Sequence, residues 1–477
     1  MARSPHLGPH RVRVSSEARD GDGQERRFLP EAGSSMSDGT FSVVLGTRDS
    51  GPPLRPATPY RFTVEHEVSG ALVGEGRFRT APVPGSREAG TTVLGVASCH
   101  LPFDQDGSYK PSALRTLRVA TAALEGAGVH RLLLVGDQIY TDHPPALSFF
   151  EADYFAQVAP PGRQGLLECS SAEIRRLYQD RYRSFWRPPS LRRLQASFAT
   201  LPAIDDHEIV DNFGTHPDHQ TSAWRRVREG ALAAFHDYQA RRVFGESRPP
   251  SFDYGVRHGD VALYVLDLRT ERRAGADGMR VLSDAQLGRL TRFLGEHRDA
   301  GAAVIVLSVP LMGLPGWLLR AAGMLATPGS NLMDRWEVDP ARSGRDALLR
   351  SVAAHAERAP RQRIVLVGGD LHIGLAHEMR LPGSDRTALQ LVSSPVSNTL
   401  DRLPPRAVST AMRMADRVRA TLIPGRPPAD QNPFCDLNLG VVEVDSTGAE
   451  VGVRLRLISH DPGDLSRPRT VYDSGFI

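Results

Sequence analysis

From about residue 91 onward, short apolar runs alternate with longer stretches in which apolar residues recur every three or four positions. Runs of the first kind predict buried strands, and those of the second kind predict amphipathic helices. The predicted strands lie near residues 93–97, 131–135, 197–204, 261–267, 303–308, 363–368 and 388–393. The predicted helices cover residues 112–125, 171–185, 222–243, 283–297 and 343–356. This alternation predicts an α/β domain over residues 91–460, and a hairpin pattern over 440–459 makes its sheet partly antiparallel.

The chain before residue 91 follows a different pattern. Short alternating segments at residues 41–45, 60–64 and 76–80 are separated by turn-rich stretches. They predict a small N-terminal β-sandwich-like module over residues 39–82. Residues 1–38 are polar and rich in Gly, Ser, Arg and Glu, which predicts disorder or a linker.

Ligand-type side chains follow three of the predicted strands directly. Cys99 comes after the run at 92–97, Asp137 after 131–135, and Asp370 after 363–367. Such residues also occur in the segments Asp205-Asp206-His207-Glu208 and Asp334-Arg335-Trp336. Buried strands that end in polar loops are where α/β sheets bind their ligands. Carboxylates, imidazoles, a thiol and a phenol at several strand ends predict a metal site.

The segment after the second strand suggests the kind of metal. Asp137 follows Gly136 and can bridge two cations, because each carboxylate oxygen can bind one of them. Tyr140 lies three residues further on, within reach of the same centre. A thiolate from Cys99, a phenolate, a carboxylate and an imidazole suit a highly charged ion such as Fe(III) better than Mg²⁺ or Ca²⁺. Taken alone, Cys99 would be a small buried hydrophobe and Gly136-Asp137 an ordinary turn.

Two further segments carry carboxylates beside a histidine. Asp370 and His372 are two residues apart, so on an extended segment both would point to one side and chelate together. Residues 205–208 place three carboxylates around His207, which is costly unless cations neutralise them. The alternative for that segment is a solvated acidic loop. In a metal site, His207 is placed to protonate a leaving alkoxide.

Composition narrows the functional classes. The chain has 477 residues, a net charge of +3 and 40% hydrophobic residues, with no apolar run long enough for a membrane span. Its basic residues, all arginine except Lys110, form no dense stripe, so no specific nucleic-acid partner is expected. The three cysteines form no evident pair, and no secretory signal is visible. These features predict a cytoplasmic protein.

As a set, these segments resemble the PhoD-type alkaline phosphatases/phosphodiesterases of the metallophosphatase (calcineurin-like) superfamily. The matching pieces are Ala-Ser-Cys99, Gly-Asp137-Gln-Ile-Tyr140-Thr-Asp142, Asp-Asp206-His207-Glu-Ile-Val-Asp-Asn212, Leu266-Asp267-Leu268-Arg269-Thr270, Ser308-Val309-Pro310, Asp334-Arg-Trp336 and Gly369-Asp370-Leu-His372. Matches run from about residue 92 to 445. Each piece is weak alone, but the set is specific.

The resemblance implies an αββα metallophosphatase sandwich and a phosphate-ester substrate hydrolysed at a dinuclear or larger metal centre. Fe(III) would be held by Cys99, Asp137, Tyr140 and His372, with Ca²⁺ or another divalent ion alongside. Asp137 would bridge the two, and the second ion would take Asp206, Asn212 and Asp370. His207 would occupy the proton donor's position and, with Asp137, make up the catalytic pair. The alternatives are a binding or scaffold protein that keeps the fold without turnover, and a hydrolase of non-phosphate esters.

Overall fold

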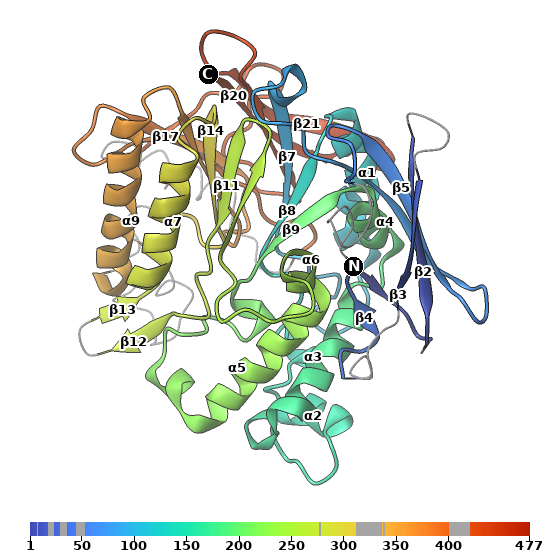
Figure 1. The fold of residues 1–477 in the computed structure, drawn as a ribbon. Coiled ribbons are helices and arrows are strands. Elements are labelled where there is room, and N and C mark those ends of the chain that lie inside the picture. Colours follow the sequence, from blue (N-terminus) through green and yellow to red (C-terminus); the bar gives the residue numbers. More distant parts are fainter. Residues whose placement is uncertain are drawn as a thin grey trace.

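Two β-sheets face each other at the centre of the computed structural model (Figure 1). The structure describes residues 1–6, 8–17, 23–28, 36–43, 53–275, 278–311, 336, 339–399 and 420–477. The first sheet has seven strands, in the order β10 (Tyr254–His258), β11 (Val261–Val265), β14 (Ala302–Leu307), β15 (Arg363–Gly368), β17 (Thr387–Val392), β16 (Leu375–Arg380) and β18 (Ala420–Leu422). Its four strands from β11 to β17 are parallel, whereas β10 and β16 run antiparallel to their neighbours.

The second sheet has six strands and carries the first half of the predicted site. Its order is β21 (Pro468–Phe476), β20 (Gly452–His460), β19 (Leu439–Asp445), β7 (Thr91–Ala97), β8 (Arg131–Val135) and β9 (Ala199–Ala203). Strands β7, β8 and β9 are parallel, and the C-terminal meander from β19 to β21 joins them antiparallel through β19. The partly antiparallel sheet is therefore confirmed, although β21 extends the domain beyond the predicted boundary at residue 460.

Helices cover the outer faces of both sheets. Between the sheets, aliphatic side chains such as Val96, Leu133, Val304 and Val367 form one buried cluster. Helices α1 (Arg115–Gly126) and α4 (Pro189–Ser197) pack on the six-stranded sheet, and α7 (Asp284–Glu296) and α9 (Asp339–Arg358) on the seven-stranded one (Figure 1). This arrangement is the predicted αββα sandwich.

A third helical group lies beyond the ends of β7, β8 and β9. It contains α2 (Ala152–Val158), α3 (Ser171–Phe185), α5 (Ser222–Phe235) and α6 (Arg241–Phe244), with a π-helical turn at His236–Ala240 joining the last two. A short ribbon of β12 (Arg273–Gly275) and β13 (Gly278–Arg280) lies nearby. Helix α3 begins where Ser170 and Glu173 form a reciprocal capping box, which satisfies two backbone N–H groups. Aromatic side chains of this group, including Tyr178 and Phe235, form their own core.

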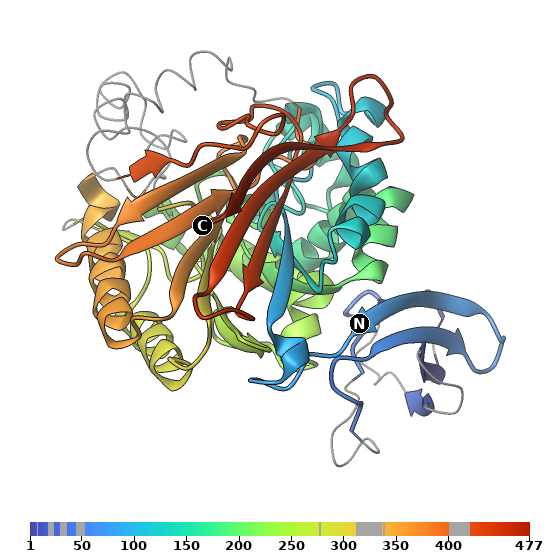
Figure 2. The same ribbon diagram turned by 90° about the horizontal axis from the view of Figure 1, so that it is seen from above.

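The N-terminal module contains more strands than the sequence pattern predicted. Four strands, in the order β3 (Gly23–Phe28), β2 (His10–Ser16), β5 (Pro59–His66) and β6 (Leu72–Arg79), form one sheet, and β1 (Ala2–Arg3) pairs with β4 (Thr40–Phe41). The prediction of disorder or a linker for residues 1–38 is therefore wrong for β1, β2 and β3. Val12 and Val14 explain the difference, because both are buried in the module's core while Arg13 between them faces outward. Figure 2 shows this module, in blue, beside the sandwich.

Candidate metal centre

Four strands deliver the predicted ligands to one end of the sandwich. Cys99 lies just beyond β7, Asp137 beyond β8, Asp206 beyond β9, and Asp370 beyond β15 of the other sheet. All four strands end there because β7, β8 and β9 are parallel to one another and the carboxyl end of β15 meets them from the facing sheet. The backbones after β15 and at the end of β8 approach closely, since a Cβ on Gly369 would lie 2.7 Å from the carbonyl oxygen of Val135.

The backbone is strained where these ligands lie. Only seven described residues other than glycine have a left-handed φ, and five of them are predicted ligands: Cys99, Asp137, Asn212, Asp370 and His372, with φ between 55° and 60°. Residues with a Cβ avoid this region, and each such placement costs about 1–3 kcal/mol. The tight turns bring the side chains back toward the strand ends, so the surrounding fold holds the ligands at a cost in backbone energy.

One side of the site gathers sulfur, phenol and imidazole. The Cys99 sulfur lies 3.3 Å from Oδ2 of Asp137, and the Tyr140 hydroxyl lies 3.4 Å from Nε2 of His372. Asn398 donates from Nδ2 to that hydroxyl at 3.3 Å, and Ser394 donates to the sulfur at 3.0 Å. Burial raises the pKa of both the Cys99 thiol and the Tyr140 phenol. Both groups would lose their protons only to a strongly positive centre.

The other side of the site is a cluster of carboxylates. One oxygen each from Asp137, Asp205, Asp206 and Asp370 lies within 4.8 Å of the others. Burial, followed by the charges of Cys99 and Asp205, raises the pKa of Asp137 well above its ordinary value. Its Oδ1 is buried and accepts no hydrogen bond. Carboxylates this close together resist joint ionisation unless cations lie between them, so the donor set fits metal ions.

Two buried side chains hold the carboxylate cluster in place. Glu208 accepts hydrogen bonds from the backbone N–H groups of Asp137, Gln138 and Asp205, at 3.0, 2.7 and 2.9 Å. Arg269, with no exposed side-chain surface, donates from Nε to Asp205 at 2.5 Å, and its Nη2 lies 3.5 Å from Asp206. The guanidinium supplies fixed positive charge, and Glu208 fixes the turn that presents Asp137.

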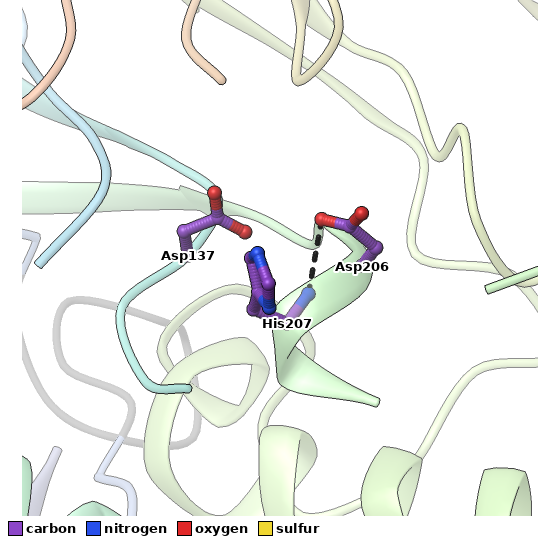
Figure 3. Close-up of side chains that lie close together, drawn as sticks. All are labelled: Asp137, Asp206 and His207. Carbon is purple, nitrogen blue, oxygen red and sulfur yellow. Dashed lines mark hydrogen bonds between the residues drawn. The ribbon is translucent and has the colours of Figure 1, made fainter. Parts of the chain in front are cut away.

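His207 stands between two of the carboxylates. Figure 3 shows its imidazole between Asp137 and Asp206, and a ring nitrogen lies within 4.8 Å of an oxygen of each. Its Nδ1 lies 2.8 Å from Asp142 and donates to that carboxylate, which fixes the ring's orientation. Burial alone would lower the pKa of His207, but Asp142 and Asp206 raise it well above its ordinary value. The geometry allows this imidazole to hold a proton or to bind a metal.

Sequence comparison places this site in a known family. The model of the PhoD-like phosphatase family matches residues 117–423, more than half of the chain. The chain belongs to the PhoD-like phosphatase family. Alkaline phosphatase D of Bacillus subtilis (strain 168) is 22% identical over 405 residues, which are 78% of this chain and 63% of that protein. This chain therefore spans less than two thirds of the relative's length.

Structural comparison supports the same fold. A solved structure of PhoD superposes with a TM-score of 0.67 at 13% sequence identity, covering 98% of this chain and 86% of the other. At that identity the likeness concerns the fold. It agrees with the αββα sandwich.

One local expectation for this PhoD-like site is wrong. The segment carrying Asp370 and His372 is not extended, because both residues have a left-handed φ and the N–H of Leu371 donates to the carbonyl of Gly369. The two side chains consequently serve different sides of the site. Asp370 belongs to the carboxylate cluster, whereas His372 lies beside Tyr140.

The structure gives less information about the remaining predicted residues. Asn212 is buried near the cluster and donates its backbone N–H to Asp206 at 2.7 Å, and a metal-binding role for its side chain stays a prediction. Asp334 lies outside the described residues, whereas Trp336 is buried and donates to the carbonyl of Val309. Sequence reasoning missed Ser394 and Asn398, and it named Asp142 and Asp205 within their segments without giving either an individual role.

Proposed function

We propose that this chain is a metal-dependent phosphoesterase of the alkaline phosphatase/phosphodiesterase type. The observation that carries the proposal is the buried carboxylate cluster of Asp137, Asp205, Asp206 and Asp370, gathered at the strand ends of a PhoD-like fold. Strained turns and a buried arginine maintain this cluster, although it opposes folding. A role in binding cations at a reaction centre explains why it is present.

We infer two kinds of metal position within this centre. Cys99, Tyr140 and His372, with Asp137, would hold Fe(III), because a thiolate and a phenolate together favour a trivalent ion. Asp206, Asn212 and Asp370 would hold Ca²⁺ or another divalent ion, since all three offer oxygen ligands. Asp137 lies between the two groups, with Oδ2 beside the Cys99 sulfur and an oxygen in the carboxylate cluster. When bound, the ions would neutralise charge developing on the phosphoryl group and activate the attacking nucleophile.

The chain's own residues would orient the ester and move a proton. His207 would protonate the oxygen of the departing alcohol, with Asp142 holding the ring through Nδ1 and keeping the imidazolium stable. Arg269 would keep Asp205 and Asp206 ionised and hold their carboxylates in position as a phosphate ester binds. The positions of the side chains around the carboxylate cluster support these roles.

The first experiment tests the shared carboxylate. The purified protein and the variant Asp137→Asn are analysed for metal content and for hydrolysis of p-nitrophenyl phosphate and bis-p-nitrophenyl phosphate. Both metals and both activities should fall together in the variant. Asp104→Asn is the matched control, because Asp104 lies in a loop and pairs with Lys110. Full activity on either ester in Asp137→Asn would overturn the proposal, and loss of only one metal would make Asp137 a terminal ligand.

The second experiment separates the two roles open to His207. His207→Ala should keep its metals and lose about 10²–10⁴-fold in turnover on an alkyl phosphate. The loss should be smaller on p-nitrophenyl phosphate, whose leaving group needs little protonation. The neighbouring loop residue His216 supplies the control His216→Ala, which should behave as wild type. Metal loss in His207→Ala would instead assign His207 as a ligand.

The third experiment identifies the ion beside Cys99. Thiolate and phenolate bound to Fe(III) should give a visible charge-transfer band that Tyr140→Phe shifts and Cys99→Ser weakens. A colourless, fully active protein containing only zinc would refute the iron assignment and leave the phosphoesterase proposal standing.

A further inference from the structure

A second group of basic side chains lies at the opposite end of β8 from the carboxylate cluster. His130 and Arg131 stand at the amino end of that strand, and His258 closes β10 beside them. The rings of His130 and His258 stack with centroids 5.5 Å apart. Asp137 lies six residues after Arg131, just past the carboxyl end of β8, so the group is about 20 Å from the proposed reaction centre.

Hydrogen bonds fix the tautomers of both histidines. Nδ1 of His130 accepts the backbone N–H of Val93 at 3.0 Å, and Nδ1 of His258 accepts Nε–H of Arg131 at 3.2 Å. A neutral imidazole has one donor and one acceptor nitrogen, so each Nε2 carries the hydrogen. The group therefore presents two imidazole N–H donors and the remaining guanidinium N–H donors of Arg131.

These donors have no carboxylate partner. Within the described part of the chain, no ion pair involves Arg131 and no hydrogen bond engages either Nε2. His258 is buried, with 3% of its surface exposed, and His130 and Arg131 are half-buried, so the group is only partly open to solvent. Burial, together with the charges of nearby basic groups such as Arg79, lowers the pKa of His130 to about 4 and that of His258 to about 3. Positive charge collected here is uncompensated.

The nearest acidic groups are occupied elsewhere. Asp260, two residues after His258, accepts the N–H of Gly85 on one oxygen and the hydroxyl of Ser446 on the other. Glu88 is exposed and within electrostatic range of Arg79 only at the rim of the group. Both carboxylates therefore have partners other than Arg131 and the two imidazoles.

The group also lies where the N-terminal module joins the sandwich. Arg79 is the last residue of β6 in the module, whereas Arg131 begins a strand of the main sheet. The turn after His258 packs against the connecting segment, since a Cβ on Gly259 would lie 2.9 Å from Pro82. A ligand bound by these residues would hold three separate parts of the chain together.

We propose that His130, Arg131 and His258, with Arg79 at the rim, bind a small oxyanion of the phosphate or sulfate class at this junction. A tetrahedral oxyanion offers several acceptor oxygens, which match the imidazole and guanidinium N–H donors of this group. The bound ion neutralises Arg131 and fastens the N-terminal module to the sandwich. The proposal is independent of the phosphoesterase function.

The test titrates the metal-loaded protein with inorganic phosphate, with sulfate, and with chloride at matched ionic strength. The readouts are the melting temperature and the imidazole ¹⁵N signals of His130 and His258. Phosphate or sulfate should raise the melting temperature saturably and shift both Nε2 signals, whereas chloride should do neither. Arg131→Gln should bind at least about tenfold more weakly and, without anion, melt no lower than wild type.

Three variants make the outcome decisive. Asp137→Asn should retain the response, which places the anion away from the carboxylate cluster. Arg79→Gln, at an exposed position, should weaken binding a few-fold and covers the case in which Arg131→Gln does not fold. Arg118→Gln on α1 should bind as wild type. An unchanged response in both Arg131→Gln and Arg79→Gln, an equal response to chloride, or loss of the response in Asp137→Asn would each overturn the proposal.

Discussion

Replacing Arg269 by glutamine should reveal how much of the protein's stability depends on cations in the carboxylate cluster. Arg269 has no exposed side-chain surface, and it contacts Asp205 at 2.5 Å and Asp206 at 3.5 Å. Removing one partner of a buried ion pair typically costs about 3–5 kcal/mol, because the other charge is left uncompensated. Glutamine keeps a hydrogen-bond donor but supplies no charge.

The loss of folding stability caused by Arg269→Gln should depend on bound metal. In protein stripped with a chelator, Arg269 is the one cation that both Asp205 and Asp206 contact among the described residues. The variant should then melt about 3–5 °C below wild type, because a chain of 477 residues loses about 1 °C for each kcal/mol. In metal-loaded protein the ions take over much of this neutralisation, so the difference should shrink.

Differential scanning calorimetry of both proteins, with and without metal, measures the effect. The matched control is Arg289→Gln. Arg289 lies on α7, makes a bidentate pair with Asp253, and has a side chain that is 41% exposed. That pair should show no dependence on metal, because neither residue belongs to the carboxylate cluster. Equal losses for Arg269→Gln in the two metal states would refute the argument that cations and Arg269 neutralise the same carboxylates.

Three further changes test other parts of the structure. Gly136→Ala should release metal and lower stability, because φ at Gly136 is +73° and the new Cβ would lie 2.3 Å from that of Asp205. The control is Gly128→Ala, where φ is +71° and the space around the new Cβ is open. This control measures the backbone cost alone, about 1–3 kcal/mol. Ser170→Ala should cost about 1 kcal/mol in chemical unfolding by removing the cap of α3, whereas Ser384→Ala on the surface should not. Stability should fall as the pH drops from about 6.5 toward 4. In the folded protein the pKa values of His130 and His258 are about 4 and about 3, below the unfolded value of about 6.5. Between these pH values only the unfolded chain takes up protons at the two histidines, which favours unfolding. Unfolding curves of His258→Gln in anion-free buffer should show a shallower acid slope, and an unchanged slope would contradict this assignment.

Much of the sandwich was predictable because its central strands are continuous apolar runs. The strand at residues 131–135 and the helix at 171–185 have the predicted bounds, the first from its unbroken apolar run and the second from its periodicity. Strands β16 and β21 escaped prediction because their sequences mix charged and apolar residues without a clear period. Their strand conformation depends on partners far along the chain, which a local pattern does not contain.

The N-terminal strands show a different reason for failure. In β2 the valines alternate with Arg11 and Arg13, a pattern that a half-buried strand produces. The high content of arginine made this stretch look like a linker. In the structure the arginines pair with Glu67 and Glu65 beside the neighbouring strand, so their charge is matched across the sheet.

At the candidate site, sequence reasoning singled out residues at strand ends, which the structure brings together, and missed residues that support them. Cys99, Asp137 and Asp370 were identifiable as a set, because each follows a buried strand directly and together they offer several ligand types. Ser394 and Asn398 reach the site from a loop more than 250 residues away from Cys99 and Tyr140 along the chain, and nothing in their local sequence marks them. Arg269 was visible within a matching motif, but its role depends on contact with Asp205, which folding alone creates.

The supporting residues explain how a centre that opposes folding is tolerated. Five predicted ligands sit in left-handed turns, and the nearby carboxylates repel one another, so both backbone and charge favour a looser arrangement. Glu208 binds three backbone N–H groups around the turn at Asp137, and Arg269 neutralises part of the cluster. Both act from buried positions on rigid strand ends, where the sandwich core prevents relaxation. The sandwich therefore supplies the energy that keeps the ligands together, and bound cations would return part of it by compensating the charges that Arg269 leaves unmatched.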